Sequence, residues 1–187
     1  MEQNASQTAL LLMDMQSSII AMIPEKNDLI SNTKKAIAHA RNNNVPIIYV
    51  TVGFRPGSPE INRNNKSFGA IKERFRNLEM SDFIKIHPDL LPQDNEIVVI
   101  KRRVSAFTGS DLEVILRSLN IQHLILAGVS TSGVVLSTLR ESADKDYRIT
   151  ILSDCCADGD DEVHRVLTTK VFPRQAEVIT AGEWING

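Results

Sequence analysis

The chain has 187 residues, a length that fits one domain and is sufficient for a sizeable hydrophobic core. Its 21 Lys and Arg residues nearly balance its 23 Asp and Glu residues, and the formal net charge of -2 favours neither a nucleic-acid partner nor an anionic membrane surface. The two cysteines, Cys155 and Cys156, are neighbours, which disfavours a structural disulfide and is typical of a reducing compartment. Because residues 1–13 lack the layout of a signal peptide or a membrane span, we expect a cytoplasmic protein.

The first half of the chain predicts two strands joined by a helix. Residues 8–13 form a short apolar run typical of a central parallel strand, and Asp14 follows them directly. Apolar residues recur at helical spacing over residues 29–41, and the β-branched run 45–52 predicts the second strand. Residues 53–95 are rich in Pro, Gly, Asn and charge, which predicts a functional loop, a lid or an oligomer contact that carries short helices.

The second half of the chain continues the alternation of strands and helices. Ser110 and Glu113 have the spacing of a capping box at the start of one helix. A second helix follows a Ser/Thr/Gly turn and ends near Lys145. The predicted strands cover residues 97–100, 124–128, 148–152 and 176–180, and a third helix covers 161–171. This alternation predicts an α/β fold with a parallel sheet, helices on both faces, and functional residues at the carboxyl ends of the strands.

Three candidate groups fall at those strand ends. Asp14 follows the first strand, where burial would raise the pKa of its carboxyl and a neighbouring cation would lower it, as suits a general acid or base. Lys101 ends the third strand and could hold Asp14 or orient a substrate, and the turn at residues 130–134 presents backbone amides at a helix start. Alternatively, Asp14 caps the turn that follows it, and Lys101 is an ordinary solvated lysine beside Arg102 and Arg103.

Other reactive residue types have simpler interpretations. No histidine falls in a predicted strand-end segment, so a serine nucleophile is disfavoured and helix capping suits the turn hydroxyls better. Cys155 and Cys156 are expected to be small buried hydrophobes. The remaining acidic residues predict a turn and an acidic helix start rather than a calcium loop; they are Asp154, Asp158, Asp160 and Asp161.

Three ordered motifs resemble those of the isochorismatase-like cysteine hydrolases. They are Leu12-Met13-Asp14-Met15-Gln16, the segment 99–107 around Lys101, and Ala127-Gly128-Val129-Ser130-Thr131. The resemblance covers residues 8–180 and implies one domain over residues 1–187. It implies a three-layer α/β/α sandwich with a six-stranded parallel sheet in the order 3-2-1-4-5-6. It further implies a cis peptide between Val129 and Ser130, a small-molecule substrate and a homo-oligomer, either a dimer or a tetramer.

Most members of the resembled family hydrolyse amides with an Asp-Lys-Cys triad. Asp14 and Lys101 match the first two positions, but the nucleophile's place falls on Val134, which has no thiol. The metal-binding His and Asp of nicotinamidases are also missing from residues 52–58. The resemblance therefore argues against nicotinamidase activity, and we expect neither a metal nor another cofactor.

The isochorismatases proper in this family also lack the cysteine, and they cleave a vinyl ether with the Asp as proton donor. By this resemblance we expect a hydrolase of a small, carboxylate-bearing substrate that works by Asp14/Lys101 acid-base catalysis, with vinyl-ether hydrolysis favoured over amide hydrolysis. The alternative is a catalytically silent member that binds a small molecule or acts as a scaffold or partner protein. The expected oxyanion and substrate contacts are Ser130, Thr131, Val134, Gln16 and Phe107, with Arg102 and Arg103 as further lining.

Overall fold

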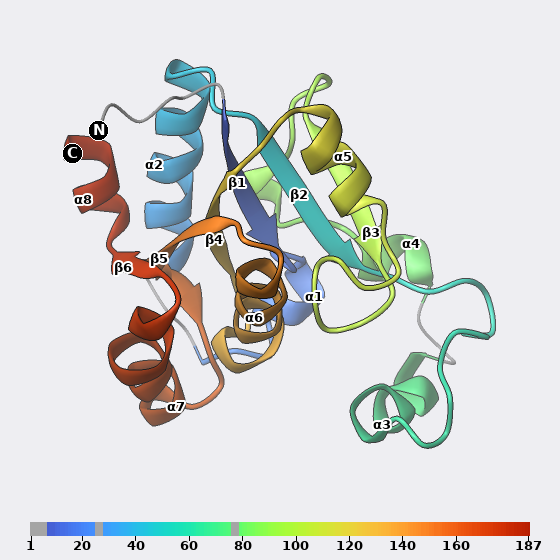
Figure 1. The fold of residues 1–187 in the computed structure, drawn as a ribbon. Helices are drawn as coiled ribbons and strands as arrows, with labels where there is room; N and C mark the ends of the chain where they lie inside the picture. Colours follow the sequence, from blue (N-terminus) through green and yellow to red (C-terminus); the bar gives the residue numbers. More distant parts are fainter. Residues whose placement is uncertain (1–6, 25–27, 76–78) are drawn as a thin grey trace.

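The computed structural model describes residues 7–24, 28–75 and 79–187. One sheet of parallel strands has the order β3-β2-β1-β4-β5-β6, which confirms the predicted α/β fold and strand order (Figure 1). The strands are β1 (Thr8–Met13), β2 (Ile47–Val52), β3 (Ile97–Lys101), β4 (His123–Val129), β5 (Arg148–Ala157) and β6 (Glu177–Ile179).

The helices cover both faces of the sheet, as the alternating pattern predicts (Figure 1). Helices α2 and α8 pack on one face, and α5 and α6 pack on the other. The α-helices are α1 (Ser17–Ile20), α2 (Leu29–Asn42), α3 (Lys66–Phe75), α4 (Met80–Phe83), α5 (Leu112–Ser118), α6 (Leu136–Asp144), α7 (Asp161–Val166) and α8 (Ala181–Asn186). Short 3-10 turns cover Pro88–Leu90 and Phe172–Arg174, and single π-helical turns cover Thr131–Val135 and Leu167–Val171.

Strand β1 lies at the centre of the sheet because all six of its side chains are apolar or small enough to be buried. Successive side chains point to opposite faces of a strand. Leu10 and Leu12 accordingly join the cluster under α2 and α8, whereas Leu11 and Met13 join the cluster under α5 and α6. The carboxyl end of β1, and with it Asp14, is therefore flanked by the ends of β2 and β4.

Strand β5 is longer than predicted. It runs to Ala157, past the predicted end at residue 152, because its pairing with β4 shifts register between Leu126 and Gly128. Such an irregularity accommodates extra residues in one strand. Asp154 thus lies inside β5, although its polar neighbourhood predicts a turn.

The start of α5 also differs from the prediction. The helix begins at Leu112 with Asp111 in the N-cap position, and no side chain caps it there. The Ser110 Oγ accepts a hydrogen bond from the Leu112 N–H at 3.2 Å, whereas the Glu113 carboxylate binds Lys145 at 2.7 Å. The predicted capping box is therefore not formed, because Ser110 binds neighbouring backbone groups and Lys145 occupies the Glu113 carboxylate.

Helix α8 lies outside the predicted elements, although its start carries a capping box. The Thr180 Oγ1 accepts from the Glu183 N–H, and the Glu183 carboxylate accepts from the Thr180 N–H at 2.7 Å. Trp184 then packs edge-on against His39 of α2, with ring centroids 4.7 Å apart. This contact ties the end of the chain to the face covered by α2.

The long segment at residues 53–95 contains the short helices expected of it. Its described part has a small apolar cluster of its own, in which the rings of Phe54 and Phe68 meet edge-on at 5.4 Å. Figure 1 shows α3 away from the sheet, beyond the end of β2. Within the described ranges, no helix is long and apolar enough to cross a membrane.

Candidate functional site

Asp14 and Lys101 meet across the end of β2. Asp14 leaves β1 in the left-handed region, with φ 53°, and its N–H still donates to the Val50 carbonyl at 2.7 Å. Lys101 is the last residue of β3 and pairs with Val52 of β2. Its side chain spans β2 and brings the Nζ atom to 2.8 Å from Asp14 Oδ2. The two side chains are only 2% and 8% exposed, for Lys101 and Asp14 respectively, so this ion pair is buried.

Burial decides the protonation of the Asp14 carboxyl. Loss of hydration raises the pKa of Asp14 to about 6, because this effect exceeds the opposing effects of the Lys101 ammonium and the Val52 backbone. Among the described residues, Asp14 Oδ1 is buried and has no hydrogen-bond partner. The carboxyl thus has one oxygen held by Lys101 and a second oxygen able to hold or accept a proton near neutral pH.

The end of β4 lies beside this pair and forms a sharp turn. The peptide between Val129 and Ser130 is cis, and the π-helical turn Thr131–Val135 then leads into α6. Glycine is required at position 128 because the backbones of β1 and β4 approach closely there. A Cβ at this position would lie 2.6 Å from the Met13 carbonyl oxygen of β1. Glycine at position 128 therefore brings the turn next to Asp14.

The outer side of the turn is held by two side chains from the next strand and helix. The Thr131 Oγ1 lies 2.8 Å from His164 Nδ1 of α7, and the Ser132 N–H donates to Asp158 Oδ2 at 2.7 Å. His164 lies on a helix, outside the predicted strand-end segments, but its side chain reaches this turn. The Thr131 hydroxyl is fully buried and anchors the turn, and its predicted contact with a substrate stays a prediction. The strand order could have revealed the contact between Thr131 and His164, since β5 and α7 follow β4 at the same edge.

Comparison with known protein families finds a match over most of the chain. Residues 8–183 match the Isochorismatase domain family. The chain belongs to the isochorismatase family.

Its relatives in the isochorismatase family extend over most of the chain. The uncharacterised isochorismatase family protein YwoC of Bacillus subtilis is 29% identical over 181 residues, which cover 96% of this chain and 93% of YwoC. The ureidoacrylate amidohydrolase RutB of Variovorax paradoxus is 30% identical over 174 residues, which cover 81% of this chain and 69% of RutB. A solved isochorismatase family protein from Burkholderia thailandensis has a TM-score of 0.83 at 25% identity, covering 95% of this chain and 93% of that one.

Val134, which the family resemblance places at the nucleophile's position, lies in an apolar environment. Val134 is 2% exposed and belongs to the cluster under α5 and α6. Next to it, a Cβ on Gly133 would lie 2.7 Å from Ser130 Oγ, so the turn leaves little space at that position. Ser130 itself is half-buried. The backbone amides of Ser130 and Val134 remain our candidates for polarising a substrate oxygen.

Gln16 has a structural role that sequence reasoning missed. Its Oε1 accepts from the Val52 N–H at 2.7 Å, and its Nε2 donates to the carbonyls of Phe83 and Val52 at 2.6 and 3.2 Å. The side chain is fully buried. Because its amide binds the end of β2 and the end of α4, the predicted substrate contact of Gln16 gains no support here and stays a prediction.

The expected lining residues are also engaged by the protein. Arg103 donates to the carbonyls of Glu60 and Arg102, and Arg102 donates to the Gly53 carbonyl. The Phe107 ring stacks on Tyr147 with centroids 6.1 Å apart. These contacts give no support to the prediction that Arg102, Arg103 and Phe107 bind substrate.

Both cysteines are free and buried, as expected of small hydrophobes. Burial raises the pKa of Cys156 to about 12 and that of Cys155 as well, so neither thiol ionises readily.

Of the nearby acidic residues, Asp160 caps α7 through the Glu162 and Val163 N–H groups. Within the described part of the chain, no three His, Cys, Asp or Glu side chains gather in a way that could hold a metal ion.

Proposed function

We propose that this isochorismatase-family protein is a hydrolase that uses Asp14 as general acid and base, Lys101 as its electrostatic partner, and no cysteine nucleophile. The observation that carries the proposal is the buried Asp14–Lys101 pair in which Asp14 Oδ1 has no partner among the described residues. A carboxyl with a pKa of about 6 is protonated in a useful fraction of molecules near neutral pH.

Vinyl-ether hydrolysis fits these groups best. Protonated Asp14 delivers its proton to the terminal alkene carbon, and the C=C electron pair forms the new C–H bond. Water adds to the resulting oxocarbenium carbon and loses a proton to the Asp14 carboxylate, which restores the acid. The hemiketal then expels the leaving oxygen, which takes the hydroxyl proton, to give an alcohol and a carbonyl compound. Lys101 stabilises the Asp14 carboxylate between the two proton transfers.

Amide hydrolysis by the usual thiolate route is not available to this chain. Val134 offers neither a lone pair nor a proton, so an amide would have to be attacked by water with Asp14 as base. The relative RutB is named as an amidohydrolase, and amides therefore belong in the test. The substrate that we propose is small and bears a carboxylate, although Arg102 and Arg103 bind loop carbonyls and are not assigned to it.

Val134 also supports a second candidate function. A family member whose nucleophile's place is filled by a buried valine could bind a small molecule, or act as a scaffold or partner protein, without turnover. This candidate predicts ligand binding that does not depend on the protonation of Asp14.

The test is a turnover screen against isochorismate, nicotinamide and simple aliphatic amides. We expect hydrolysis of the vinyl ether, and a loss of about 100-fold in kcat/KM for Asp14→Asn. Asp111→Asn is the matched control, since Asp111 is exposed and its side chain does not cap α5. Turnover that survives Asp14→Asn contradicts the proposed mechanism, and a complete lack of turnover favours the silent alternative.

A further inference from the structure

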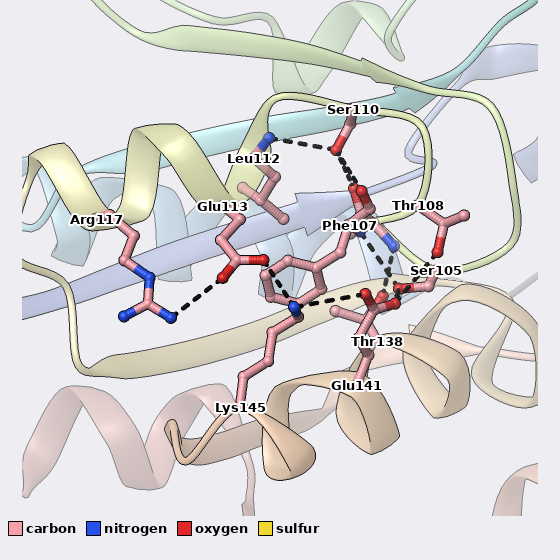
Figure 2. Close-up of polar contacts among 11 residues, drawn as sticks. Ser105, Phe107, Thr108, Ser110, Leu112, Glu113, Arg117, Thr138, Glu141 and Lys145 are labelled. Atoms are coloured by element: carbon pink, nitrogen blue, oxygen red, sulfur yellow. Dashed lines mark hydrogen bonds and ion pairs between the residues drawn. The ribbon is translucent and has the colours of Figure 1, made fainter.

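The carboxylate of Glu141 in α6 binds the segment that follows Lys101, residues 102–111. Figure 2 shows Glu141 of α6 facing two hydroxyls of this segment. Glu141 Oε2 accepts from Ser105 Oγ at 2.5 Å and from Thr108 Oγ1 at 3.3 Å. We call residues 102–111 the Lys101 loop. Bonds to an ionised acceptor are stronger than neutral ones, so Glu141 is a firm attachment point for this loop.

A second attachment lies one turn earlier on the same helix face. Thr138 is fully buried, and its Oγ1 accepts from the Ala106 N–H at 3.0 Å. Residues three apart on a helix lie side by side, so Thr138 and Glu141 bind adjacent parts of the Lys101 loop (Figure 2). Within the loop, Ser110 Oγ donates to the Ala106 carbonyl at 2.6 Å and stiffens it.

The Lys101 loop carries an acceptor for the Lys101 ammonium. The Nζ atom donates to the Arg103 carbonyl at 2.9 Å while it contacts Asp14 Oδ2 at 2.8 Å. Arg103 in turn reaches the Glu60 carbonyl with its guanidinium at 2.7 Å. The position of the Arg103 carbonyl therefore depends on how the loop is attached at both ends, and so does the position of the ammonium.

We infer that Glu141 and Thr138 are positioning residues that hold the Lys101 loop so that the Arg103 carbonyl keeps the Lys101 ammonium on Asp14. Both residues lie on the helix that continues from the 131–135 turn. The same helix thus aligns the Asp14–Lys101 pair with the turn amides. The inference rests on the proposed function only in taking that pair as the acting one.

A neighbouring carboxylate provides a matched control. Glu113 of α5 binds Lys145 at 2.7 Å and Arg117 at 3.1 Å in the same cluster (Figure 2). In the described contacts, its carboxylate makes no bond to the Lys101 loop. Removing Glu113 disturbs the contacts of Lys145, which also lies 4.0 Å from Glu141 and over the Phe107 ring, but it leaves the Ser105, Ala106 and Thr108 bonds to α6 in place.

The experiment follows the titration of the Asp14 carboxyl by 13C NMR in the full chain, assigned with Asp14→Asn. Lys101→Met provides the reference, since it removes the ammonium and raises the pKa of Asp14. We expect Glu141→Ala to raise this pKa by about one unit. Thr138→Val, which is nearly isosteric, should shift it in the same direction. Glu141→Gln should restore most of the native value, and Glu113→Ala should leave it unchanged.

An unshifted Asp14 titration in Thr138→Val and Glu141→Ala would overturn the inference, as would an equal shift in Glu113→Ala. If Glu141→Ala does not fold, Thr138→Val decides alone. The titration needs no substrate, so it stands even if the screen finds no turnover. Conversely, turnover that depends on Asp14 together with an unchanged titration removes only the positioning role of Glu141 and Thr138.

Discussion

At the scale of single residues, Asp14 combines properties that rarely occur together. Its carboxyl is buried, one oxygen contacts the Lys101 ammonium, and the other has no partner among the described residues. A buried group with an unsatisfied oxygen is costly, and such groups are common where a protein does chemistry. The raised pKa of Asp14 makes its role accessible to a simple measurement.

The direction of the pH profile distinguishes acid from base catalysis by Asp14. Its pKa is about 6, so the carboxyl is protonated below this pH and ionised above it. If Asp14 acts as general acid, kcat/KM for the reacting substrate falls about tenfold per pH unit above pH 6. We expect that result, measured by initial rates from pH 4.5 to 8.5. A rate that falls below pH 6 instead would assign Asp14 as a base and favour amide hydrolysis.

Val134 permits a second test of the turn. In Val134→Cys, the new thiol would take the position that the family resemblance gives to the nucleophile, where a cation and backbone amides would favour the thiolate. We expect iodoacetamide at pH 7 to alkylate it at least about tenfold faster than Cys155 and Cys156, whose pKa values are raised. Val135→Cys is the control, because Val135 is buried in the same cluster but does not take the position that the resemblance gives to the nucleophile. Equal reactivity of the two variants would mean that the turn no longer supports a nucleophile.

At the scale of elements, the site depends on how closely β1 and β4 approach. Gly128 of β4 pairs with Met13 of β1, directly before Asp14. A side chain at Gly128 would meet backbone atoms of β1 rather than the end of a flexible side chain, so the strands would have to move apart. The alignment of the turn with Asp14 is thus set by the backbones of two neighbouring strands.

Gly128→Ala should therefore destabilise the protein strongly. The added Cβ would lie 2.6 Å from the Met13 carbonyl oxygen, and we expect a loss of about 3 kcal/mol in the free energy of unfolding. Gly159→Ala is the matched control, since nothing lies within 4 Å of its added Cβ. Urea unfolding measures both variants. A loss for Gly128→Ala no greater than that for Gly159→Ala would contradict this account of the β1–β4 contact.

At the scale of the whole molecule, a series of side-chain hydrogen bonds joins four strands at the end of the sheet opposite Asp14. His123 of β4 lies between Thr8 of β1, at 3.3 Å, and Thr150 of β5, at 2.9 Å. Thr150 also donates to Glu177 of β6 at 3.4 Å. Burial, with the nearby Arg148 charge as a smaller cause, lowers the pKa of His123 to about 4. This buried histidine therefore couples the stability of the sheet to pH.

The sign of that coupling follows from the two pKa values of His123. The unfolded chain binds more protons between the ordinary value of 6.5 and the folded value of about 4, so stability falls as the pH is lowered through this window. We expect a loss of up to about 3 kcal/mol from this group. The measurement is the difference in unfolding free energy between the native chain and His123→Gln at pH 7 and pH 4.5. Because Asp14 titrates in both proteins, its effect cancels. A difference independent of pH would contradict this role of His123.

The homo-oligomer implied by the family resemblance stays a prediction. Sedimentation equilibrium of the full chain would show whether it is a dimer, a tetramer or neither.

The sequence by itself determined the order of strands and helices and the residues at the strand ends. Apolar runs such as residues 8–13 and the helical spacing over residues 29–41 are local patterns, and burial of both sheet faces requires them. Asp14 and Lys101 could be found in the same way, because each directly ends an apolar run. The capping box at Thr180 shows that α8 could also have been found from such a local signal.

Only the tertiary structure decided which polar groups remain available for chemistry. Gln16, Thr131 and Arg103 have the types and positions of substrate contacts, yet each binds a group distant in the sequence. Glu113 is missing from the predicted capping box for the same reason, since it binds Lys145 at the end of α6. A hydrogen-bonding group joins whichever partner the fold brings within about 3 Å, and local sequence does not specify that partner. Asp14 differs from these residues because the fold leaves one of its oxygens without a described partner.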